Sequence, residues 1–215
     1  MLKSDYESVS FHANGLGDRA AIDLVRQGYF QAFVDLVPGT FSEYLLGGNR
    51  PSGPDRLDIT RDNPIPYIFC PGGFDMISCG PLERKGQGDA LWVSGRLAER
   101  KLHVKDNLRV QARTSIKEME ELGTAVADKL NCYVNKARVK VVIPQKSFSS
   151  ISVEGEALFD PVADRAFIKA LRRGLDPEIG IIEVDSDINS PDFARVVANT
   201  LSEVARGASD GDHPW

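Results

Sequence analysis

Short apolar runs alternate along this chain with stretches whose apolar residues recur every three or four positions. The runs are rich in Val, Ile, Phe and Tyr, as strands are, and proline directly follows three of them. They lie at residues 9–12, 32–37, 65–70, 139–143 and 181–184. Strands alternating with helices predict one three-layer, Rossmann-like α/β domain over residues 1–206, with a mostly parallel sheet of about five strands and helices on both faces. Residues 207–215 show no period and are predicted to form a disordered tail.

Capping residues mark where three of the helices begin. Ser115 followed by Glu118 forms a capping box before a long apolar stripe. Asp160 and Ser190 each precede a proline, which suits the first turn of a helix. Glycines interrupt residues 80–112, where no period persists, so the sequence predicts only a long excursion there.

Composition places the chain among ordinary globular proteins. Its 215 residues are 42% hydrophobic and 27% charged, and the formal charge of −5 argues against a nucleic-acid partner. No apolar run reaches the roughly 18 to 20 residues of a membrane span, and no apolar signal region follows the N-terminus, so we expect a cytoplasmic protein without a membrane partner. The three cysteines lack a CxxC spacing and the three histidines are scattered, so no metal site is predicted.

Ligands of open parallel sheets bind beyond the carboxyl ends of the strands, so the loops there hold the candidate site residues. Residues 15–20 have the pattern G-x-G-x-x-A between a predicted strand and a predicted helix. There Asn14, Gly15 and Gly17 would let backbone N–H groups approach a phosphate. The alternative is a tight turn in which Asp18 caps the helix, and its charge would repel a phosphate.

A second glycine-rich loop, residues 47–56, is longer than a connector needs. Its two arginines, Arg50 and Arg56, could clamp an oxyanion. The alternative is a surface turn around Asp55 and Arg56. The candidate ligand contacts in this loop are Gly48, Gly53, Asp55 and Arg56.

Three other strand ends carry candidates for catalysis or ligand contact. Asp75, which follows Gly73, could accept from a ligand hydroxyl or act as a base, or could instead cap a helix. His12 could be a general acid or base, or could make one structural hydrogen bond. Asp187 and Asn189 have the spacing that opens a calcium loop, but the glycine and distal glutamate of such a loop are missing, so only ligand contact is predicted.

Short motifs spread from about residue 6 to residue 205 carry a family resemblance. They include residues 11–17 (FHANGLG), 52–57 (SGPDRL), 113–114 (RT), 129–131 (KLN), 159–161 (FDP) and 188–194 (INSPDFA). In this order they resemble the C-terminal, Rossmann-like domain of the Tm-one-like ATP-binding family, which includes a tomato tobamovirus-resistance protein. The resemblance implies that the chain binds ATP or another nucleotide, and it adds Arg113 and Thr114 to the candidate ligand contacts. In the plant member it implies contact with viral replication proteins.

The chain departs from this family pattern in three ways. Relatives have a separate N-terminal domain, and a strand and helix precede the segment that matches Val9. We therefore expect apolar surface near Val9 or Trp92, covered in a homo-oligomer or by a protein partner. A His-Asn-Pro segment of the relatives is replaced by residues 105–107 (KDN), and a Thr-rich loop is shortened to residues 37–40. Both changes affect loops that face the crevice, so we expect ligand binding to be altered or lost relative to the relatives, with the fold retained.

Three functions follow as hypotheses. The preferred one is binding of a small phosphorylated ligand at the glycine turn and Arg56, with Asp75 contacting a hydroxyl. The second is an enzyme acting on a carboxylate or phosphate ester, with His12 or Asp75 transferring a proton and Arg56 or Arg113 holding the oxyanion. The third is a non-catalytic interaction subunit whose exposed first strand pairs with a partner chain.

Overall fold

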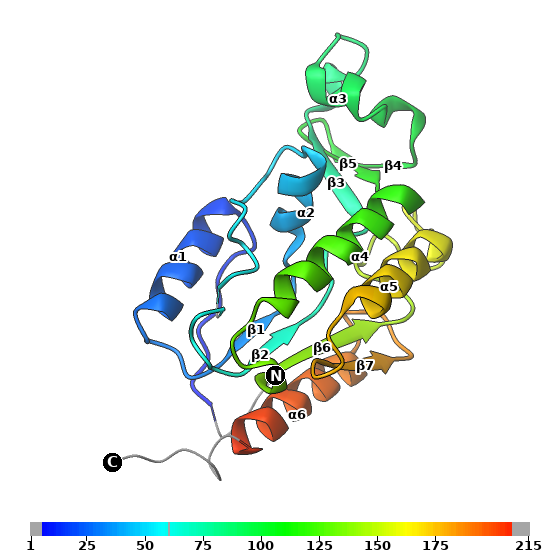
Figure 1. Ribbon diagram of the computed structural model, residues 1–215. Helices are drawn as coiled ribbons and strands as arrows, with labels where there is room; N and C mark the ends of the chain where they lie inside the picture. Colours follow the sequence, from blue (N-terminus) through cyan, green and yellow to red (C-terminus); the bar gives the residue numbers. More distant parts are fainter. Residues whose placement is uncertain (1–5, 60, 208–215) are drawn as a thin grey trace.

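A computed structural model describes residues 6–59 and 61–207 of the chain (Figure 1). Four strands form a parallel sheet in the order β1-β2-β6-β7. They are Phe33–Asp35, Tyr67–Phe69, Val139–Pro144 and Gly180–Val184, and each overlaps a run that the sequence predicts. This sheet confirms the Rossmann-like α/β fold class. Most of the tail predicted to be disordered, residues 208–215, lies outside the described residues.

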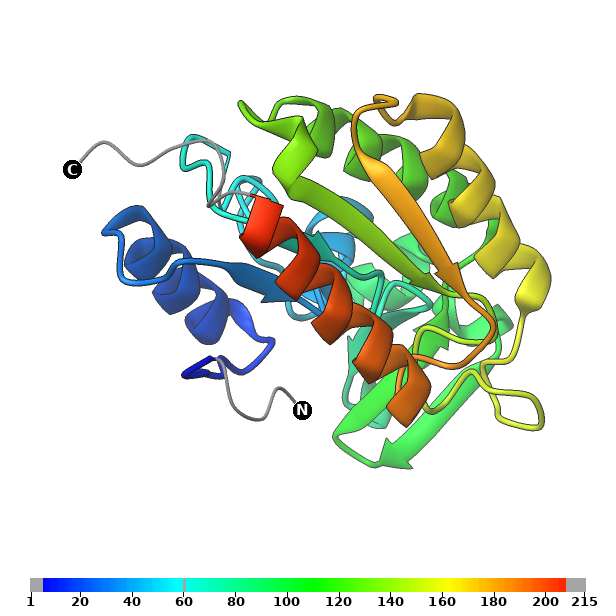
Figure 2. The same ribbon diagram turned by 90° about the horizontal axis from the view of Figure 1, so that it is seen from below.

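Helices lie on both sides of the parallel sheet. Side chains alternate along β2, so that Tyr67 and Phe69 belong to one core while Ile68 and the following Cys70 belong to another. The first core includes residues of α1, α2, α4 and α5, and the second includes residues of α6. Figure 2 shows α6 on the opposite side of the sheet from α4 and α5. The helices are α1 (Gly15–Arg26), α2 (Gly39–Leu46), α4 (Ile116–Asn131), α5 (Pro161–Gly174) and α6 (Pro191–Gly207).

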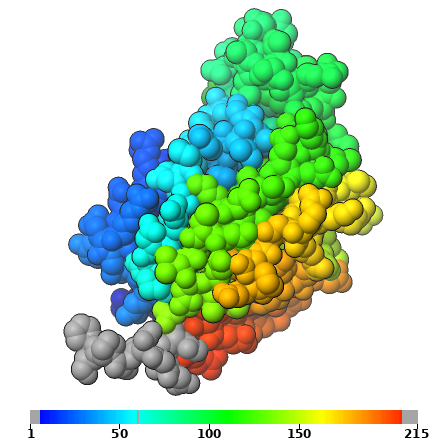
Figure 3. Space-filling view, in the orientation of Figure 1, coloured from blue at the N-terminus to red at the C-terminus, as the bar shows by residue number. Residues whose placement is uncertain are grey.

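The predicted excursion is a second, antiparallel sheet in the order β3-β5-β4. It has a small core of its own around Trp92 and Leu97, and it projects beyond one end of the parallel sheet (Figures 1 and 3). Gly80, Gly86 and Gly88 have φ of +73°, +82° and +73°, the left-handed values that glycine adopts most readily, so these glycines form turns. The elements of this region are β3 (Met76–Gly80), β4 (Leu102–Asp106), β5 (Arg109–Arg113), α3 (Ala90–Ser94) and two short 3-10 helices, Leu82–Arg84 and Leu97–Glu99. A third 3-10 helix, Lys136–Arg138, precedes β6.

The prediction of a strand at residues 9–12 is wrong. Residues 6–12 have no regular secondary structure, so the described parallel sheet has four strands rather than about five. Val9 is 64% exposed, whereas Phe11 packs edge-on against Phe30 with ring centroids 5.7 Å apart. One partly buried aromatic side chain, Phe11, holds this segment against the core, but no described strand pairs with it to accept its backbone hydrogen bonds.

The predicted helix starts are confirmed. Ser115 and Glu118 form both bonds of the capping box at α4, and Asp160 accepts from the backbone N–H of Ala163 at α5. The Ser190 hydroxyl accepts from the N–H of Phe193 at 3.0 Å. Among the described residues, no helix is long and apolar enough to cross a membrane.

Candidate functional site

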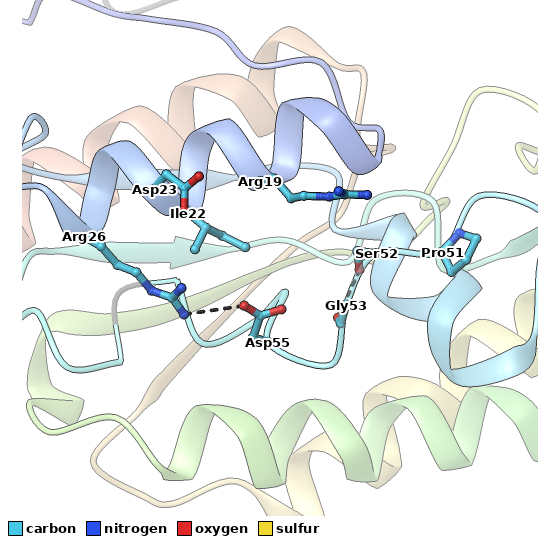
Figure 4. Close-up of a pocket in the computed structure, with 8 residues that line it drawn as sticks. All are labelled: Arg19, Ile22, Asp23, Arg26, Pro51, Ser52, Gly53 and Asp55. Atoms are coloured by element: carbon cyan, nitrogen blue, oxygen red, sulfur yellow. Dashed lines mark hydrogen bonds and ion pairs between the residues drawn. The ribbon is translucent and has the colours of Figure 1, made fainter.

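A pocket of about 430 Å³ lies between α1 and the loop that follows α2 (Figure 4). This volume is within the range of small-molecule sites, roughly 300 to 1,000 Å³. We call it the α1 pocket. It is lined by Arg19, Ile22, Asp23 and Arg26 of α1 and by Pro51, Ser52, Gly53 and Asp55 of the loop.

Helical spacing brings the four α1 residues to one face. Positions 19, 22, 23 and 26 follow the i, i+3, i+4, i+7 pattern of a helix surface. Ile22 is buried in the main core with Ala21 and Val25, which fixes how α1 is rotated. Arg19 and Arg26 therefore stand at the border of the buried stripe, two helical turns apart.

The loop takes its shape from a few backbone bonds. α2 ends at Leu46, and the following Gly47 caps it with a φ of +75°, which reverses the chain. The N–H of Ser52 donates to the carbonyl of Thr40 at 3.0 Å, and the N–H of Arg56 donates to the carbonyl of Gly53 at 3.2 Å. These bonds hold the loop between α2 and α1, where it forms the second wall of the pocket.

The two arginines of the pocket differ in their partners. The Arg26 guanidinium lies 3.5 Å from the Asp55 carboxylate, and both side chains are about half exposed. Arg19 is exposed and makes no hydrogen bond or ion pair with any described residue. Figure 4 shows its guanidinium directed toward Ser52, at the opposite end of the pocket from the Arg26–Asp55 pair. One cation of the pocket is therefore available to an anionic ligand.

Arg56 lies beneath this loop in a buried ion cluster rather than in the pocket. Its guanidinium donates to Asp35 at 2.6 and 2.8 Å and to Asp18 at 2.8 Å, and it is 4% exposed. The Tyr67 hydroxyl donates to Asp35 at 3.0 Å. The cluster ties the loop to β1 and to the first turn of α1. Arg56 thus anchors the pocket wall, and in this conformation it is fully engaged rather than free to clamp an oxyanion.

Burial and charge act against each other in this cluster. Burial raises the pKa of Asp18 above its usual value, and the charge of Arg56 only partly offsets that rise. Burial alone would lower the pKa of Arg56. The charge of Asp35 and the hydrogen bonds to it outweigh burial, so the pKa of Arg56 lies above its usual value. Arg56 therefore stays protonated. Asp18 is an ion-pair partner, so the alternative prediction that it caps α1 is wrong.

The cap of α1 is Asn14. Its side-chain oxygen accepts from the N–H groups of Leu16 and Gly17 at 3.1 and 2.9 Å. A Cβ on Gly17 would lie 2.0 Å from the His12 carbonyl oxygen, so this glycine allows the preceding loop to pass close to the helix. Gly15 has more room, with Pro51 as its nearest neighbour at 3.5 Å. The predicted glycine turn exists, and in this structure its N–H groups point to Asn14.

Asp75, Arg113 and Thr114 come together where the two sheets join. Arg113 donates to the backbone carbonyl of Asp75 at 2.9 Å and to the Asp164 carboxylate at 2.5 Å. The Ser149 hydroxyl donates to the Asp75 carboxylate at 2.5 Å, and the N–H of Thr114 bonds to the Asp75 carbonyl at 3.3 Å. Asp75 is 0% exposed, so its carboxylate has no contact with solvent or with a ligand dissolved in it.

The remaining predicted residues occupy turns around the same edge of the parallel sheet. Gly73 has φ of +77°, and its N–H donates to the carbonyl of Phe148. Gly48 leaves space for the Glu43 carboxylate, which a Cβ there would meet at 1.7 Å. The Asp187 carboxylate accepts from the N–H of Asn189 at 2.8 Å in the turn after β7. None of these four residues, Gly48, Gly73, Asp187 and Asn189, lines the α1 pocket. Among the described residues no cluster has the side chains of a metal site.

Of the residues predicted from the sequence, Gly53 and Asp55 line the α1 pocket, whereas His12 does not. His12 is exposed, with a ring nitrogen 3.2 Å from the Asn14 amide. Sequence reasoning missed Arg19, Ser52 and Arg26. The signal for the arginines was their seven-residue spacing on a predicted helix, but any exposed helix face gives the same signal.

The fold and the pocket together define a Rossmann-like α/β domain with a pocket of small-molecule size beside its first helix. Residues 1–205 match the C-terminal domain of the uncharacterised protein family UPF0261. The chain belongs to this family.

Two similar proteins show how far the likeness extends. A UPF0261 protein of Clostridium tetani is 32% identical over 197 residues, which is 91% of this chain and 46% of that protein. The ToMV resistance protein Tm-1(GCR237) of tomato, Solanum lycopersicum, is 27% identical over 207 residues, 95% of this chain and 26% of that protein. The chain therefore spans less than half the length of these relatives. The family resemblance predicted from the sequence is confirmed, for the C-terminal domain.

Proposed function

We propose that this domain binds a small phosphorylated molecule in the α1 pocket. The observation that carries the proposal is Arg19, an arginine directed along a cavity of about 430 Å³ and not paired with any described residue. A guanidinium recognises phosphate oxygens through paired N–H groups. The Ser52 hydroxyl on the opposite wall donates to the Gly53 carbonyl at a long 3.4 Å, a weak bond that a phosphate oxygen would replace.

Rigid walls support the same proposal. Ile22 fixes α1 against the core, and Arg56 fixes the loop through its bonds to Asp35 and Asp18. A pocket whose walls are already held in place loses less conformational entropy when a ligand binds. The family resemblance favours ATP or another nucleotide as the first ligand to test. A cytoplasmic location, where such metabolites are abundant, is part of the proposal.

Thermal unfolding with orthophosphate, ribose 5-phosphate, AMP and ATP tests the proposal. A ligand at 100 times its Kd stabilises the folded state by about 2.7 kcal/mol, which is readily measured as a rise in melting temperature. Arg19→Ala should remove the rise. The matched control is Arg173→Ala, which removes an exposed arginine from α5 and should leave the rise intact. A wild-type melting curve that none of the four compounds moves would show that the proposal is wrong.

A further inference from the structure

We infer that the ligand of the α1 pocket carries a single phosphate together with sugar hydroxyl groups, and is not a nucleoside triphosphate. This inference rests on the proposed function and specifies the chemical class of its ligand. Three features of the described residues carry it: the balance of charge in the pocket, the lack of further phosphate donors around it, and the carboxylates at one end.

The balance of charge limits the number of phosphates. Arg19 and Arg26 are opposed by Asp23 and Asp55, so the formal charges of the lining cancel. Arg26 is already paired with Asp55 at 3.5 Å. Of the two arginines that line the pocket, Arg19 is therefore the one without a hydrogen bond or ion pair to any described residue. One guanidinium matches one phosphate group, whereas a triphosphate chain would place further negative charges beside the two carboxylates.

The donors that usually hold a polyphosphate are occupied. Phosphate chains in nucleotide-binding folds rest on free N–H groups at a helix N-terminus. In α1 the N–H groups of Leu16 and Gly17 donate to Asn14, and that of Asp18 donates to the Asn14 carbonyl at 2.9 Å. Asp18 adds a buried carboxylate to this first turn, and Arg56 is held by carboxylates. Of the N–H groups in this first turn, a polyphosphate would therefore find only that of Gly15 free, and it would meet no additional cation there.

The carboxylates suit hydroxyl groups. Carboxylate oxygens accept hydrogen bonds from ribose hydroxyls in dinucleotide-binding folds. The Asp23 side chain is exposed, and Figure 4 shows Arg19 extending away from it rather than toward it. Ile22 lies between the Arg19 end of the pocket and the Arg26–Asp55 end, where a carbon skeleton would pack. A phosphate at Arg19 and hydroxyls at Asp23 and Asp55 thus give the ligand one orientation.

Isothermal titration with ribose 5-phosphate, AMP, orthophosphate and ATP, the last with and without Mg²⁺, tests the inference. Ribose 5-phosphate or AMP should bind at least about ten-fold tighter than orthophosphate, because each adds a hydrogen bond to a charged group. Each should also bind at least about ten-fold tighter than ATP, because the additional phosphates of ATP are repelled by the two carboxylates. Asp23→Asn should weaken the sugar-bearing monophosphate about ten-fold, leave orthophosphate unchanged and strengthen ATP, because it removes a negative charge. The control Asp128→Asn, an exposed carboxylate on α4, should change none of these values.

The results distinguish a failure of the inference about the ligand class from a failure of the proposed phosphate binding. ATP binding more tightly than both monophosphates, or Asp23→Asn binding them like the wild type, would overturn the inference while the proposed function stands. If none of the phosphates binds, the proposed function and the inference fail together. A comparison of ribose 5-phosphate with AMP then distinguishes a sugar phosphate from a nucleotide as the ligand.

Discussion

The Arg56 guanidinium meets the Asp35 carboxylate side by side, with Nη1 2.6 Å from Oδ2 and Nη2 2.8 Å from Oδ1. Both side chains are less than 5% exposed, and Asp18 binds the remaining edge of the guanidinium. Two acidic side chains and one basic side chain thus share a site that is almost closed to solvent. The loop that carries Arg56 cannot move away from β1 without separating these charges.

Replacing Arg56 should therefore lower the free energy of unfolding of the domain strongly. Arg56→Met leaves Asp18 and Asp35 buried without their cation, and breaking a buried pair in this way costs roughly 3 to 5 kcal/mol. Arg26→Ala breaks an exposed pair and should cost about 0 to 1 kcal/mol. Urea denaturation measures both values. Equal losses of stability in the two variants would contradict the assignment of Arg56 as an anchor.

The two glycines at the start of α1 allow a test of how closely the preceding loop packs against the helix. Gly17→Ala places a methyl group 2.0 Å from the His12 carbonyl oxygen, so the loop must shift and the melting temperature should fall. Gly15→Ala meets its nearest neighbour at 3.5 Å, an ordinary contact, and alanine favours the helix. Thermal unfolding should show that Gly15→Ala is at least as stable as the wild type. A stable Gly17→Ala protein would contradict the packing observed here.

Asp164 should make stability depend on pH. Burial raises its pKa to about 6, although the charge of Arg113 acts in the opposite direction. Between pH 3.8 and about 6 the folded state keeps a proton that the unfolded chain releases, so the free energy of unfolding falls as pH rises through that interval. The full effect is roughly 3 kcal/mol at about 1.4 kcal/mol per pH unit.

Asp164→Asn removes this titration. The free energy of unfolding of the Asp164→Asn protein, measured by urea denaturation at several pH values, should fall less between pH 4 and pH 6 than that of the wild type. Comparing slopes rather than absolute stabilities cancels the cost of the lost bond to Arg113. Parallel curves for the two proteins would show that Asp164 keeps an ordinary pKa.

The contact between α4 and α5 depends on Gly123. A Cβ at this position would lie 2.6 Å from the Phe167 carbonyl oxygen and 2.9 Å from the Ala170 methyl group. Gly123→Leu should separate the helices and cost more than the roughly 1 to 3 kcal/mol of ordinary overpacking. Lys117→Leu, on an exposed position of the same helix, is the control. Similar denaturation midpoints for both variants would exclude tight helix packing.

Association of the chain also stays a prediction. Val9, Val93 and Leu108 are 64%, 63% and 71% exposed, which places apolar side chains on the N-terminal segment and on the small sheet. Light scattering should give a mass above the 23.6 kDa of one chain. A stable monomer that binds no apolar dye would show that these side chains are scattered surface residues.

The elements that the sequence predicts correctly carry their own local signals. Ser115 and Glu118 cap α4 through bonds within three residues of one another. The apolar run of β6, which only Lys140 interrupts, follows from burial on both faces. Residues 9–12 show the limit of this reasoning. Their alternation resembles a strand, but a strand exists only when a neighbour accepts its backbone bonds, and the local sequence does not contain that neighbour.

The pocket could be predicted only in part for the same reason. Gly53 and Asp55 lie in a loop whose composition marks it as a binding candidate. Arg19 lies on a helix more than thirty residues away, and only the folded chain brings the two together. The sequence alone also predicts that Arg56 is free to bind an oxyanion. The carboxylates that bind it, Asp18 and Asp35, are distant along the chain, so the local sequence does not reveal them.

The bond between the Thr114 N–H and the Asp75 carbonyl has an architectural consequence. It joins the residue just before β3 to the residue just after β5, so the polypeptide leaves and re-enters the main body at almost the same point. Without residues 76–113, β2, α4 and β6 would form an ordinary parallel crossover. Residues 76–113, which form the antiparallel sheet, are in this sense an insertion. A short peptide linking positions 75 and 114 would reconnect the chain and leave the parallel sheet undisturbed.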